Sequence, residues 1–295
     1  MGTKYGNKNP TLTSGECRYR IRENAGKEQL RTYEKVCVAL SGGVDSTLMT
    51  LLAVEALGRE RVHAVIVDAP FTIPEETARA EQLCREQGIV YEIIRFDSMP
   101  PVFYENPPDR CYHCKKIIFT AIIEYARRHG ITQIVDGTNA DDTQDYRPGM
   151  KALQELGVAS PLKDNGFMKA EVRILLQERG SRIADEPSSA CLASRIPYGT
   201  PVTEKILQKV YQAEKMIRSF GIRQCRVRHQ NDTLVRIEVA AAVMERLVAE
   251  PVRTAIITAL KSLGYLYITI DLEGYRTGSA STAYPLCPSK EGEKI

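Results

Sequence analysis

The feature that most constrains the fold is a short apolar run that ends in a glycine-rich turn. Residues 36–40 are apolar, and four to eight apolar residues that end at glycine indicate a buried parallel strand. The sequence Ser41-Gly-Gly-Val-Asp-Ser46 follows, and residues 47–58 have helical spacing up to a glycine. A polar loop is therefore predicted between the carboxyl end of a strand and the amino end of a helix.

This loop has the properties of an anion-binding site. The first N–H groups of a helix lack partners within the helix and lie at the positive end of its dipole, and glycines let a phosphate approach the backbone. The loop is not a Walker loop, because no lysine stands between Ser41 and Ser46. The alternative interpretation is a tight turn that starts the helix, with Asp45 or Ser46 as a local hydrogen-bond partner.

Further apolar runs predict a parallel sheet. Residues 61–68, 90–96 and 131–136 indicate three more strands, and stretches of helical length separate them. This alternation predicts an α/β fold with a doubly wound parallel sheet. Ligands of such sheets bind at the carboxyl ends of the strands. The Ser41 loop, Asp68, Cys111 and residues 137–142, which begin with Gly137, are all expected at that edge.

The pattern changes near residue 200. The later part of the chain indicates a helix over residues 204–220 and strands over residues 225–229, 234–239 and 265–272. We predict two domains: residues 1–200, of which residues 1–14 are disordered, and a smaller α+β domain with an antiparallel sheet over residues 201–295.

Composition and charge limit the classes of function. The 295 residues carry a formal net charge of +3, so nothing global favours nucleic acid as a partner. No apolar run has the length of a membrane span, and the polar amino terminus lacks the pattern of a signal peptide. We therefore expect a cytoplasmic protein with no membrane partner. In that compartment the eight cysteines indicate metal binding, catalysis or burial rather than disulfides.

Three cysteines form a candidate site. Cys111 and Cys114 make a Cys-x-x-Cys motif, which fits a redox pair, half of a zinc site or coincidence. Cys191 follows in a loop of proline and small residues, near the same edge of the sheet. Three thiolates can hold a [4Fe–4S] cluster with one iron left open, and the alternative for Cys191 is a small buried residue. The other cysteines are interpreted as buried or terminal residues without a site: Cys17, Cys37, Cys84, Cys225 and Cys287.

Charged residues alternate with apolar ones in the predicted hairpin of the second domain. Arg226 and Arg228 stand on the first strand, and Arg236 and Glu238 on the second. Because side chains alternate between the faces of a strand, these four are expected on one face. The face is either solvated or a site for a phosphate- or carboxylate-rich substrate, since arginine binds those groups bidentately.

Together these motifs resemble a known family. A strand, a Ser-Gly-Gly-x-Asp-Ser loop and a helix are typical of the PP-loop ATP pyrophosphatases, which have an adenine nucleotide alpha hydrolase-like fold. Within that superfamily the sequence resembles the LarE family from about residue 30 to residue 282. The motifs that carry the resemblance are Ser41-Gly-Gly-Val-Asp-Ser46, Arg110-Cys-Tyr-His-Cys-Lys115, Gly137-Thr-Asn-Ala-Asp-Asp142, Ser189-Ala-Cys-Leu-Ala-Ser-Arg195, the Arg226 and Arg228 strand with Arg236-Ile-Glu238, and Gly274-Tyr-Arg-Thr-Gly-Ser279.

LarE proteins are sulfur transferases that help to build the nickel-pincer nucleotide of lactate racemase. The resemblance implies that ATP, assisted by Mg²⁺, adenylates the carboxylates of pyridinium-3,5-biscarboxylic acid mononucleotide, which then become thiocarboxylates. It implies a phosphate site made of Ser41, Gly42, Gly43, Asp45 and Ser46, with Asp68 and Gly137 beside it. It also implies that Arg195, Arg226 and Arg228 bind the substrate, and that Asp45, Arg195 and Cys191 take part in catalysis.

Members of the family deliver sulfur in two ways. In some, the cysteine that matches Cys191 gives up its own sulfur; others use three cysteines and a [4Fe–4S] cluster to present sulfide. This sequence has the three-cysteine pattern, which implies Cys111, Cys114 and Cys191 as ligands and sulfide or another donor as the sulfur source. The resemblance further implies a homo-oligomer, a hexamer.

Two other functions stay open at this point. One is a [4Fe–4S]-dependent tRNA thiolation enzyme, although the sequence has no separate RNA-binding domain and no strongly basic run. The other is an iron–sulfur regulatory protein that senses a nucleotide without turning it over.

Overall fold

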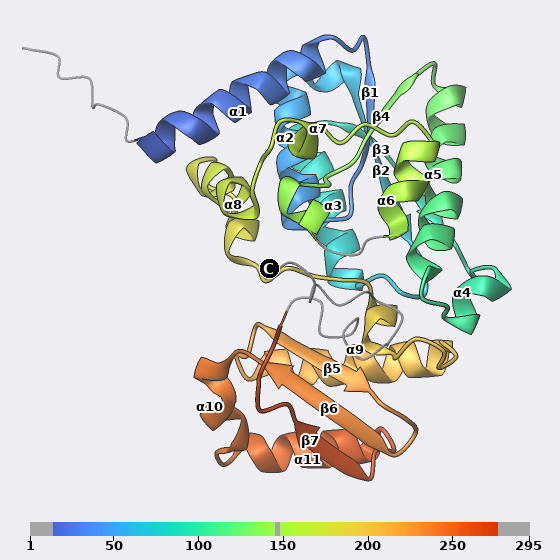
Figure 1. Ribbon diagram of the computed structural model, residues 1–295, viewed down its shortest axis with the longest axis vertical. Coiled ribbons are helices and arrows are strands. Elements are labelled where there is room, and N and C mark those ends of the chain that lie inside the picture. The colour runs from blue at the N-terminus through green and yellow to red at the C-terminus, as the bar shows by residue number, and fades with distance from the viewer. Residues whose placement is uncertain (1–13, 145–147, 277–295) are drawn as a thin grey trace, which may run out of the picture.

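The computed structural model describes residues 14–144 and 148–276 (Figure 1). Its strands are β1 (Val36–Ala39), β2 (Val62–Asp68), β3 (Val90–Arg95), β4 (Gln133–Val135), β5 (Cys225–His229), β6 (Leu234–Val239) and β7 (Tyr267–Ile270). Its α-helices are α1 (Ser14–Arg31), α2 (Val44–Leu57), α3 (Pro74–Gln87), α4 (Pro101–Glu105), α5 (Arg110–Arg128), α6 (Pro148–Glu155), α7 (Pro161–Asp164), α8 (Lys169–Glu178), α9 (Glu204–Ser219), α10 (Met244–Val248) and α11 (Val252–Ser262). No helix within these residues is long and apolar enough to cross a membrane.

Some predictions fall outside this part of the chain. They are the disorder of residues 1–13, Cys287, and residues 277–279 of the last motif. The side chain of Cys17 is likewise not described.

β1 lies inside a four-stranded sheet of order β3-β2-β1-β4, and all its pairings are parallel. Successive side chains of β1 point to opposite faces: Val36 and Val38 pack with α1, α2 and α8, and Cys37 packs with α5. α3 covers the face that α2 covers, and α6 lies beside α5 on the other (Figure 1). Helices on both faces of a parallel sheet confirm the predicted doubly wound α/β fold.

Two glycines let the loops at the carboxyl edge of this sheet pack closely on their neighbours. Gly42 has a φ of 74°, and a Cβ there would lie 2.0 Å from the carbonyl oxygen of Glu76 in α3. A Cβ on Gly137, just after β4, would lie 2.6 Å from the backbone nitrogen of Ser46. Only glycine permits both approaches. The loop after β1 is thereby fixed between α3 and the end of β4.

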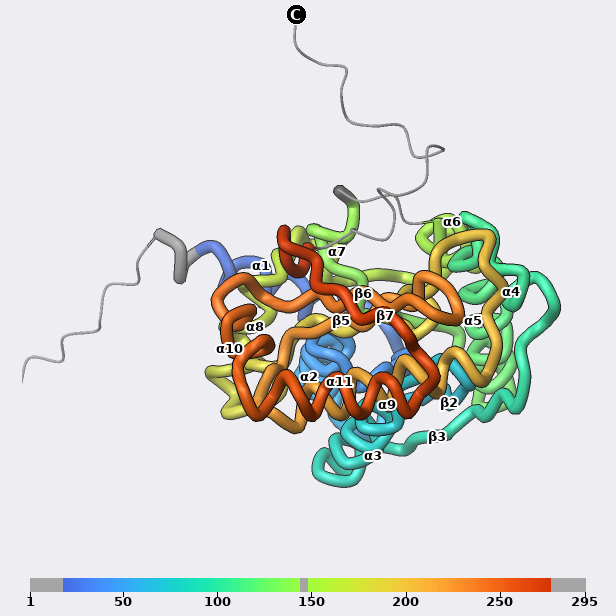
Figure 2. The backbone as a smooth tube through the Cα atoms, turned by 90° about the horizontal axis from the view of Figure 1, so that it is seen from below, coloured from blue at the N-terminus to red at the C-terminus, as the bar shows by residue number. Residues whose placement is uncertain are grey.

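The second sheet has the order β5-β6-β7. β5 and β6 are antiparallel, but β6 and β7 are parallel, so the prediction of a wholly antiparallel sheet is wrong. The connection explains the difference: α10 and α11 return the chain to the starting end of β6, and such a crossover produces a parallel pair. α9 and α11 lie side by side on one face of this sheet (Figure 2).

α9 packs against both parts of the molecule. Leu207, near its start, joins an apolar cluster with Phe71 and Phe103 of the first part. Ile217, two turns or more further on, belongs to the core under the second sheet. The domain boundary after residue 200 stays a prediction, and the apolar contacts continue across that point.

A network of charges ties α1 to α8. The residue Glu23 is 4% exposed. Its carboxylate accepts hydrogen bonds from Arg20 at 2.8 Å, from Lys27 at 2.9 Å and from Arg179. Burial raises the pKa of this carboxyl, but the bonds from Lys27, Arg179 and Arg20 outweigh burial and lower its pKa to about 2. The charged form is therefore the one that the fold stabilises.

We predict that Glu23→Gln destabilises the protein by about 1.5–3 kcal/mol at neutral pH, the range for hydrogen bonds to charged groups. A carboxyl whose pKa is lowered in the folded state adds stability above its unfolded pKa, and this stability disappears as the pH falls from 4.5 toward about 2. Urea unfolding at several pH values measures the effect. Glu28→Gln, which removes an exposed partner of Arg31, is the control and should change the midpoint little. A pH-independent difference between wild type and Glu23→Gln would contradict the assignment.

Candidate active site

Two serines shape the loop between β1 and α2. The hydroxyl groups of Ser41 and Ser46 are 3.0 Å apart, and Ser46 also accepts the backbone N–H of Ser41 at 3.2 Å and donates to the carbonyl of Gly43 at 3.2 Å. Gly43 is the N-cap of α2 and supplies no side-chain cap. The loop therefore turns into the helix with its first N–H groups uncapped by a side chain, which is the arrangement of an anion site.

Asp45 lies in the first turn of α2 beside this loop. One of its carboxylate oxygens accepts from the amide of Asn139 at 3.1 Å, and the other pairs with the ammonium group of Lys169. Lys169 is the first residue of α8 and lines the same cavity as the loop. No sequence motif surrounds Lys169, so it was not predicted, and only the fold brings it to Asp45. It supplies a cation that the loop itself does not contain.

A second acidic group stands behind the loop. Asp136, at the end of β4, is 5% exposed and accepts from the hydroxyl of Ser160 at 2.7 Å and from the backbone N–H of Thr138 at 3.2 Å. The ammonium of Lys115 lies 3.7 Å from its carboxylate. Lys115 comes from α5, directly after Cys114, so the helix that carries the Cys-x-x-Cys motif also reaches the end of the cavity at which Asp136 lies.

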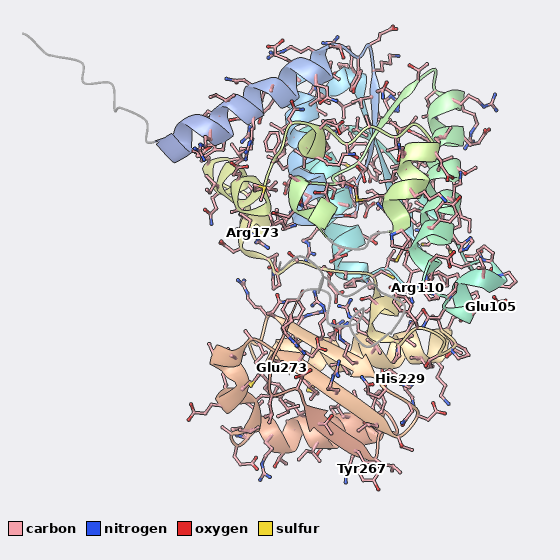
Figure 3. All side chains as sticks on the ribbon, viewed as in Figure 1. Glu105, Arg110, Arg173, His229, Tyr267 and Glu273 are labelled. Atoms are coloured by element: carbon pink, nitrogen blue, oxygen red, sulfur yellow. The ribbon has the colours of Figure 1, made fainter. Side chains whose placement is uncertain are left out.

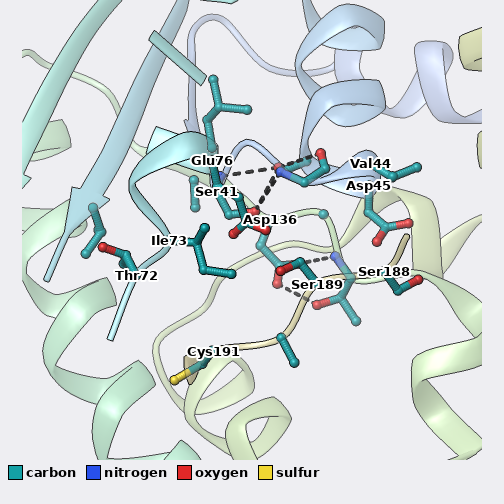
Figure 4. A pocket seen from close by; sticks show the side chains of 18 of the residues that line it. Ser41, Val44, Asp45, Thr72, Ile73, Glu76, Asp136, Ser188, Ser189 and Cys191 are labelled. Atoms are coloured by element: carbon teal, nitrogen blue, oxygen red, sulfur yellow. Dashed lines mark hydrogen bonds between the residues drawn. The ribbon is translucent and has the colours of Figure 1, made fainter. Parts of the chain in front are cut away.

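These groups surround a cavity of about 430 Å³. The predicted residues that line it are Ser41, Gly43, Asp45, Ser46, Gly137 and Cys191. Cys191 lies across the cavity from Ser41 and Asp45 (Figure 4). Gly42 does not line it and instead packs on α3. Asp68, also outside its lining, is half exposed at the end of β2 and lies 3.6 Å from Arg95.

The three candidate cysteines are neighbours. Burial raises the pKa of Cys114, and the nearby thiols of Cys191 and Cys111 raise it further. Burial also raises the pKa of Cys191, while the Arg110 guanidinium opposes this. Cys111 is exposed and the other two are partly exposed. Within residues 14–144 and 148–276, however, no three His, Cys, Asp or Glu side chains are arranged to hold a metal ion.

Hydrogen bonds bring the two cysteine segments together. Arg110 begins α5, at the end of the helix that faces the second sheet (Figure 3). Its guanidinium donates to the side chain of Asn106 and to the carbonyl of Ala193 at 3.2 Å. Asn106 in turn donates to the carbonyls of Pro197 and Thr200, both at 2.8 Å. The start of α5 is thus fixed to the loop of Cys191.

Cys37, Cys84 and Cys225 are buried as predicted. Burial raises the pKa of each thiol to about 12. These three cysteines are therefore thiols at neutral pH.

Arg195 is buried away from both the cavity and solvent. Its side chain and that of Glu214 in α9 are each 0% exposed, and they form a bidentate ion pair with distances of 2.8 and 3.0 Å. The third nitrogen of the guanidinium donates to the carbonyls of Ala190 and of Cys191, the latter at 3.0 Å. Arg195 therefore holds the backbone on which Cys191 stands.

Arg226 and Arg228, on β5, donate hydrogen bonds to the loop that carries Cys191. Arg226 donates to the carbonyl of Ser188, and Arg228 donates to the carbonyl of Ser194 at 3.0 Å and to Glu238 at 2.7 Å. Their predicted position on one face of the hairpin is confirmed by the strand register. Arg226 and Arg228 are buried because the loop of residues 188–194 covers them, while Arg236 on the same face is partly exposed.

A second cavity of about 280 Å³ lies beyond this loop. The cations that line it are Arg79, Lys215, Arg218, Arg223 and Arg226, and the carboxylates are Glu75, Glu76 and Glu186. Of the three arginines predicted to bind substrate, Arg226 lines the second cavity, while Arg195 and Arg228 line neither of these two cavities.

A parallel sheet with this loop at its carboxyl edge defines a PP-loop domain of the NAD synthase type, and residues 21–119 match the NAD synthase family. The chain is 36% identical over 250 residues to the pyridinium-3,5-bisthiocarboxylic acid mononucleotide synthase of Lactiplantibacillus plantarum. The aligned residues make up 84% of this chain and 90% of that protein. The chain belongs to that protein's family, the LarE family.

Two further relatives differ in how much of the chain they match. An uncharacterized protein of Synechocystis is 37% identical over 256 residues, which is 85% of this chain and 95% of the relative. The NH(3)-dependent NAD(+) synthetase of Pyrobaculum aerophilum is 29% identical over 163 residues, or 52% of this chain and 60% of the synthetase. The likeness to synthetases is thus partial, while that to the LarE family spans most of the chain.

We predict that Glu214→Gln destabilises the protein by about 3–5 kcal/mol, because removing one partner of a buried ion pair leaves the other charge uncompensated. The urea midpoint measures the change. Glu250→Gln, which removes the partner of Arg253 in a pair exposed on both sides, is the control and should cost less than about 1 kcal/mol. Equal midpoints for the two variants would show that Arg195 does not depend on Glu214.

Proposed function

We propose that this protein is an ATP-dependent sulfur transferase that converts the carboxylates of pyridinium-3,5-biscarboxylic acid mononucleotide to thiocarboxylates. One observation carries the proposal: the cavity with the Ser41 loop on one side has Cys191 on the other. A site for ATP phosphates and a site for sulfur thus open onto the same space. Membership of the LarE family supports this choice of substrate.

The chemistry explains why both sites are needed. A carboxylate does not expel oxide, so sulfur cannot displace it directly. In the proposed first step a carboxylate oxygen attacks the α-phosphorus of ATP, the bond to the bridging oxygen breaks, and pyrophosphate leaves with the electron pair. In the second step sulfur attacks the carbonyl carbon and loses its proton, and AMP leaves with the electrons of the carbon–oxygen bond.

The residues of the loop are suited to the first step. The uncapped start of α2 and the hydroxyls of Ser41 and Ser46 face the cavity and would bind phosphate oxygens. Lys169 adds a positive charge and is held in place by Asp45. Asp45 and Ser46 also provide the hard oxygen donors that Mg²⁺ prefers. When bound, Mg²⁺ would neutralise charge on the departing pyrophosphate.

The second cavity is suited to the rest of the substrate. Lys215, Arg218, Arg223 and Arg226 bring positive charge to its wall. A mononucleotide carries a phosphate and this one also two carboxylates, and such groups are bound by guanidinium forks. Arg195 and Arg228 would act indirectly, since they hold the loop that separates the two cavities.

Cys111, Cys114 and Cys191 match the residue type and number that a [4Fe–4S] cluster with three protein ligands requires, and their thiols are neighbours. Their side chains are not arranged to hold a metal ion in this structure, so the cluster would require them to move closer together. A bound cluster would supply an open iron that takes up sulfide between turnovers. Without a cluster, Cys191 would be the sulfur donor and would become dehydroalanine after one turnover. The presence of Cys111 and Cys114 beside Cys191 favours the first alternative.

We predict that Asp45→Asn lowers pyrophosphate release at least about 100-fold, since it removes the carboxylate that holds Lys169 and faces the phosphates. Pyrophosphate release is measured with ATP and the biscarboxylic acid mononucleotide, and urea unfolding checks the fold. The control is Asp164→Asn, a surface carboxylate beside Lys163. Unchanged release by a folded Asp45→Asn protein would refute the ATP site.

We predict that Cys→Ser at position 111, 114 or 191 removes the iron and brown colour of anaerobically purified protein and ends repeated turnover with sulfide. Cys84→Ala, at a buried cysteine away from the site, should keep both. Mass spectrometry of Cys191 after turnover is the second measurement. A loss of about 34 Da there, the mass of H₂S, would show dehydroalanine and refute the cluster alternative.

A further inference from the structure

The two cavities share a wall. Both are lined by Ile73, Glu76, Arg79 and residues 186–189. ATP would bind on the side of this wall that faces the Ser41 loop. The anionic substrate would bind on the side that faces Arg218, Arg223 and Arg226. A side chain in this shared wall is therefore placed to reach both a bound ATP and a bound anionic substrate. Among the described residues that line both cavities, Arg79 is the only cation.

Backbone packing fixes the position of Arg79 relative to the loop. Gly42 lies against the turn of α3 from which Arg79 projects: a Cβ on Gly42 would lie 2.0 Å from the carbonyl oxygen of Glu76 and 3.3 Å from the backbone nitrogen of Ala80. The phosphate loop and the Arg79 turn therefore touch through main-chain atoms. Such a contact leaves little freedom for one to shift without the other.

The guanidinium of Arg79 has N–H donors that are not engaged by close hydrogen bonds to other described side chains. Its side chain is 38% exposed, but its Nε is buried and has no hydrogen-bond partner among the described residues. Its closest ion pair, to Glu76, is 3.8 Å long, which is beyond hydrogen-bond distance. Arg195 is the contrast, because its donors are taken by Glu214 and by loop carbonyls. A buried donor without a protein partner is rare in folded proteins, and this one is available to a bound anion or to water.

The carboxylates of the shared wall have other partners. The carboxyl of Glu76 is hydrogen-bonded to the side chain of Ser189, and burial raises its pKa. The carboxylate of Glu186 lies 3.9 Å from Arg223. The charge of Arg79 is therefore not cancelled by a close ion pair.

We propose that Arg79 contacts the α-phosphoryl group of ATP and the attacking carboxylate of the substrate in the adenylation step, which makes it a catalytic residue that the loop motif does not contain. This inference rests on the proposed function. As the carboxylate oxygen bonds to the α-phosphorus and the bond to pyrophosphate breaks, negative charge accumulates on the non-bridging oxygens. A fork with two parallel N–H donors stabilises that charge while it draws the two anions together.

The test compares Arg79→Gln with Arg85→Gln, which lies on the same helix but is 63% exposed and pairs with Glu81. We expect Arg79→Gln to release pyrophosphate about 100-fold more slowly, with the Kd of ATP changed less than about threefold, and Arg85→Gln to match wild type. Arg79→Lys, which keeps the charge but loses the fork, should lie between them. Normal pyrophosphate release by a folded Arg79→Gln protein, or an equal loss of ATP affinity, would overturn the proposal.

A second measurement separates this inference from the proposed function. Nicotinoyl sulfamoyl adenosine imitates an acyl adenylate and carries both the acyl group and a substitute for the α-phosphate. Arg79→Gln should bind it at least about tenfold more weakly than wild type does, while the affinity for AMP changes less than about threefold. If wild type releases no pyrophosphate with the mononucleotide but shows this difference, the proposed substrate is wrong and the role of Arg79 stands. Equal affinity of both proteins for the analogue would overturn that role.

Discussion

The buried ion pair between Arg195 and Glu214 is the interaction on which the arrangement of the site depends. Two charges without solvent exposure are costly to bury, and only close geometry with further hydrogen bonds offsets that cost. Here Glu214 also accepts from the backbone N–H of Val227 at 3.1 Å, and Arg195 also bonds the carbonyl of Cys191 at 3.0 Å. One pair of side chains thus links α9, the edge strand of the second sheet and the loop of Cys191.

This link explains why the two cavities described above are in contact. Guanidinium groups of Arg110, Arg195, Arg226 and Arg228 all donate to main-chain carbonyls between Ser188 and Ser194. A loop held in this way forms a wall, with the phosphate loop on one side and a basic cavity on the other. The proposed adenylation transfers AMP from a nucleoside triphosphate to an anionic substrate. It needs two such binding spaces with one common boundary. The same loop carries Cys191, which lines the first cavity.

The pattern of the chain was sufficient to predict the parallel sheet and its loop, because a buried strand followed by glycine and a helix is a local signal. It was sufficient to place Arg226 and Arg228 on one face, since the period of a strand is fixed. It did not reveal that the loop of Cys191 covers that face, or that β7 runs parallel to β6. Those contacts join segments far apart in the sequence, and no local period encodes them.

The sequence by itself therefore determined the elements, the phosphate loop and the three cysteines, each of which depends on residue type and spacing over a few positions. The tertiary structure decided what the charged residues do. Arg195 is buried and forms an ion pair with Glu214. Lys169 pairs with Asp45, which is 124 residues away in the sequence. The Nε of Arg79, in the wall between the two cavities, has no hydrogen-bond partner among the described residues. An arginine has the same chemistry in each of these places. Its role follows from which carboxylates and carbonyls the fold brings within hydrogen-bond distance and from how much water the fold excludes.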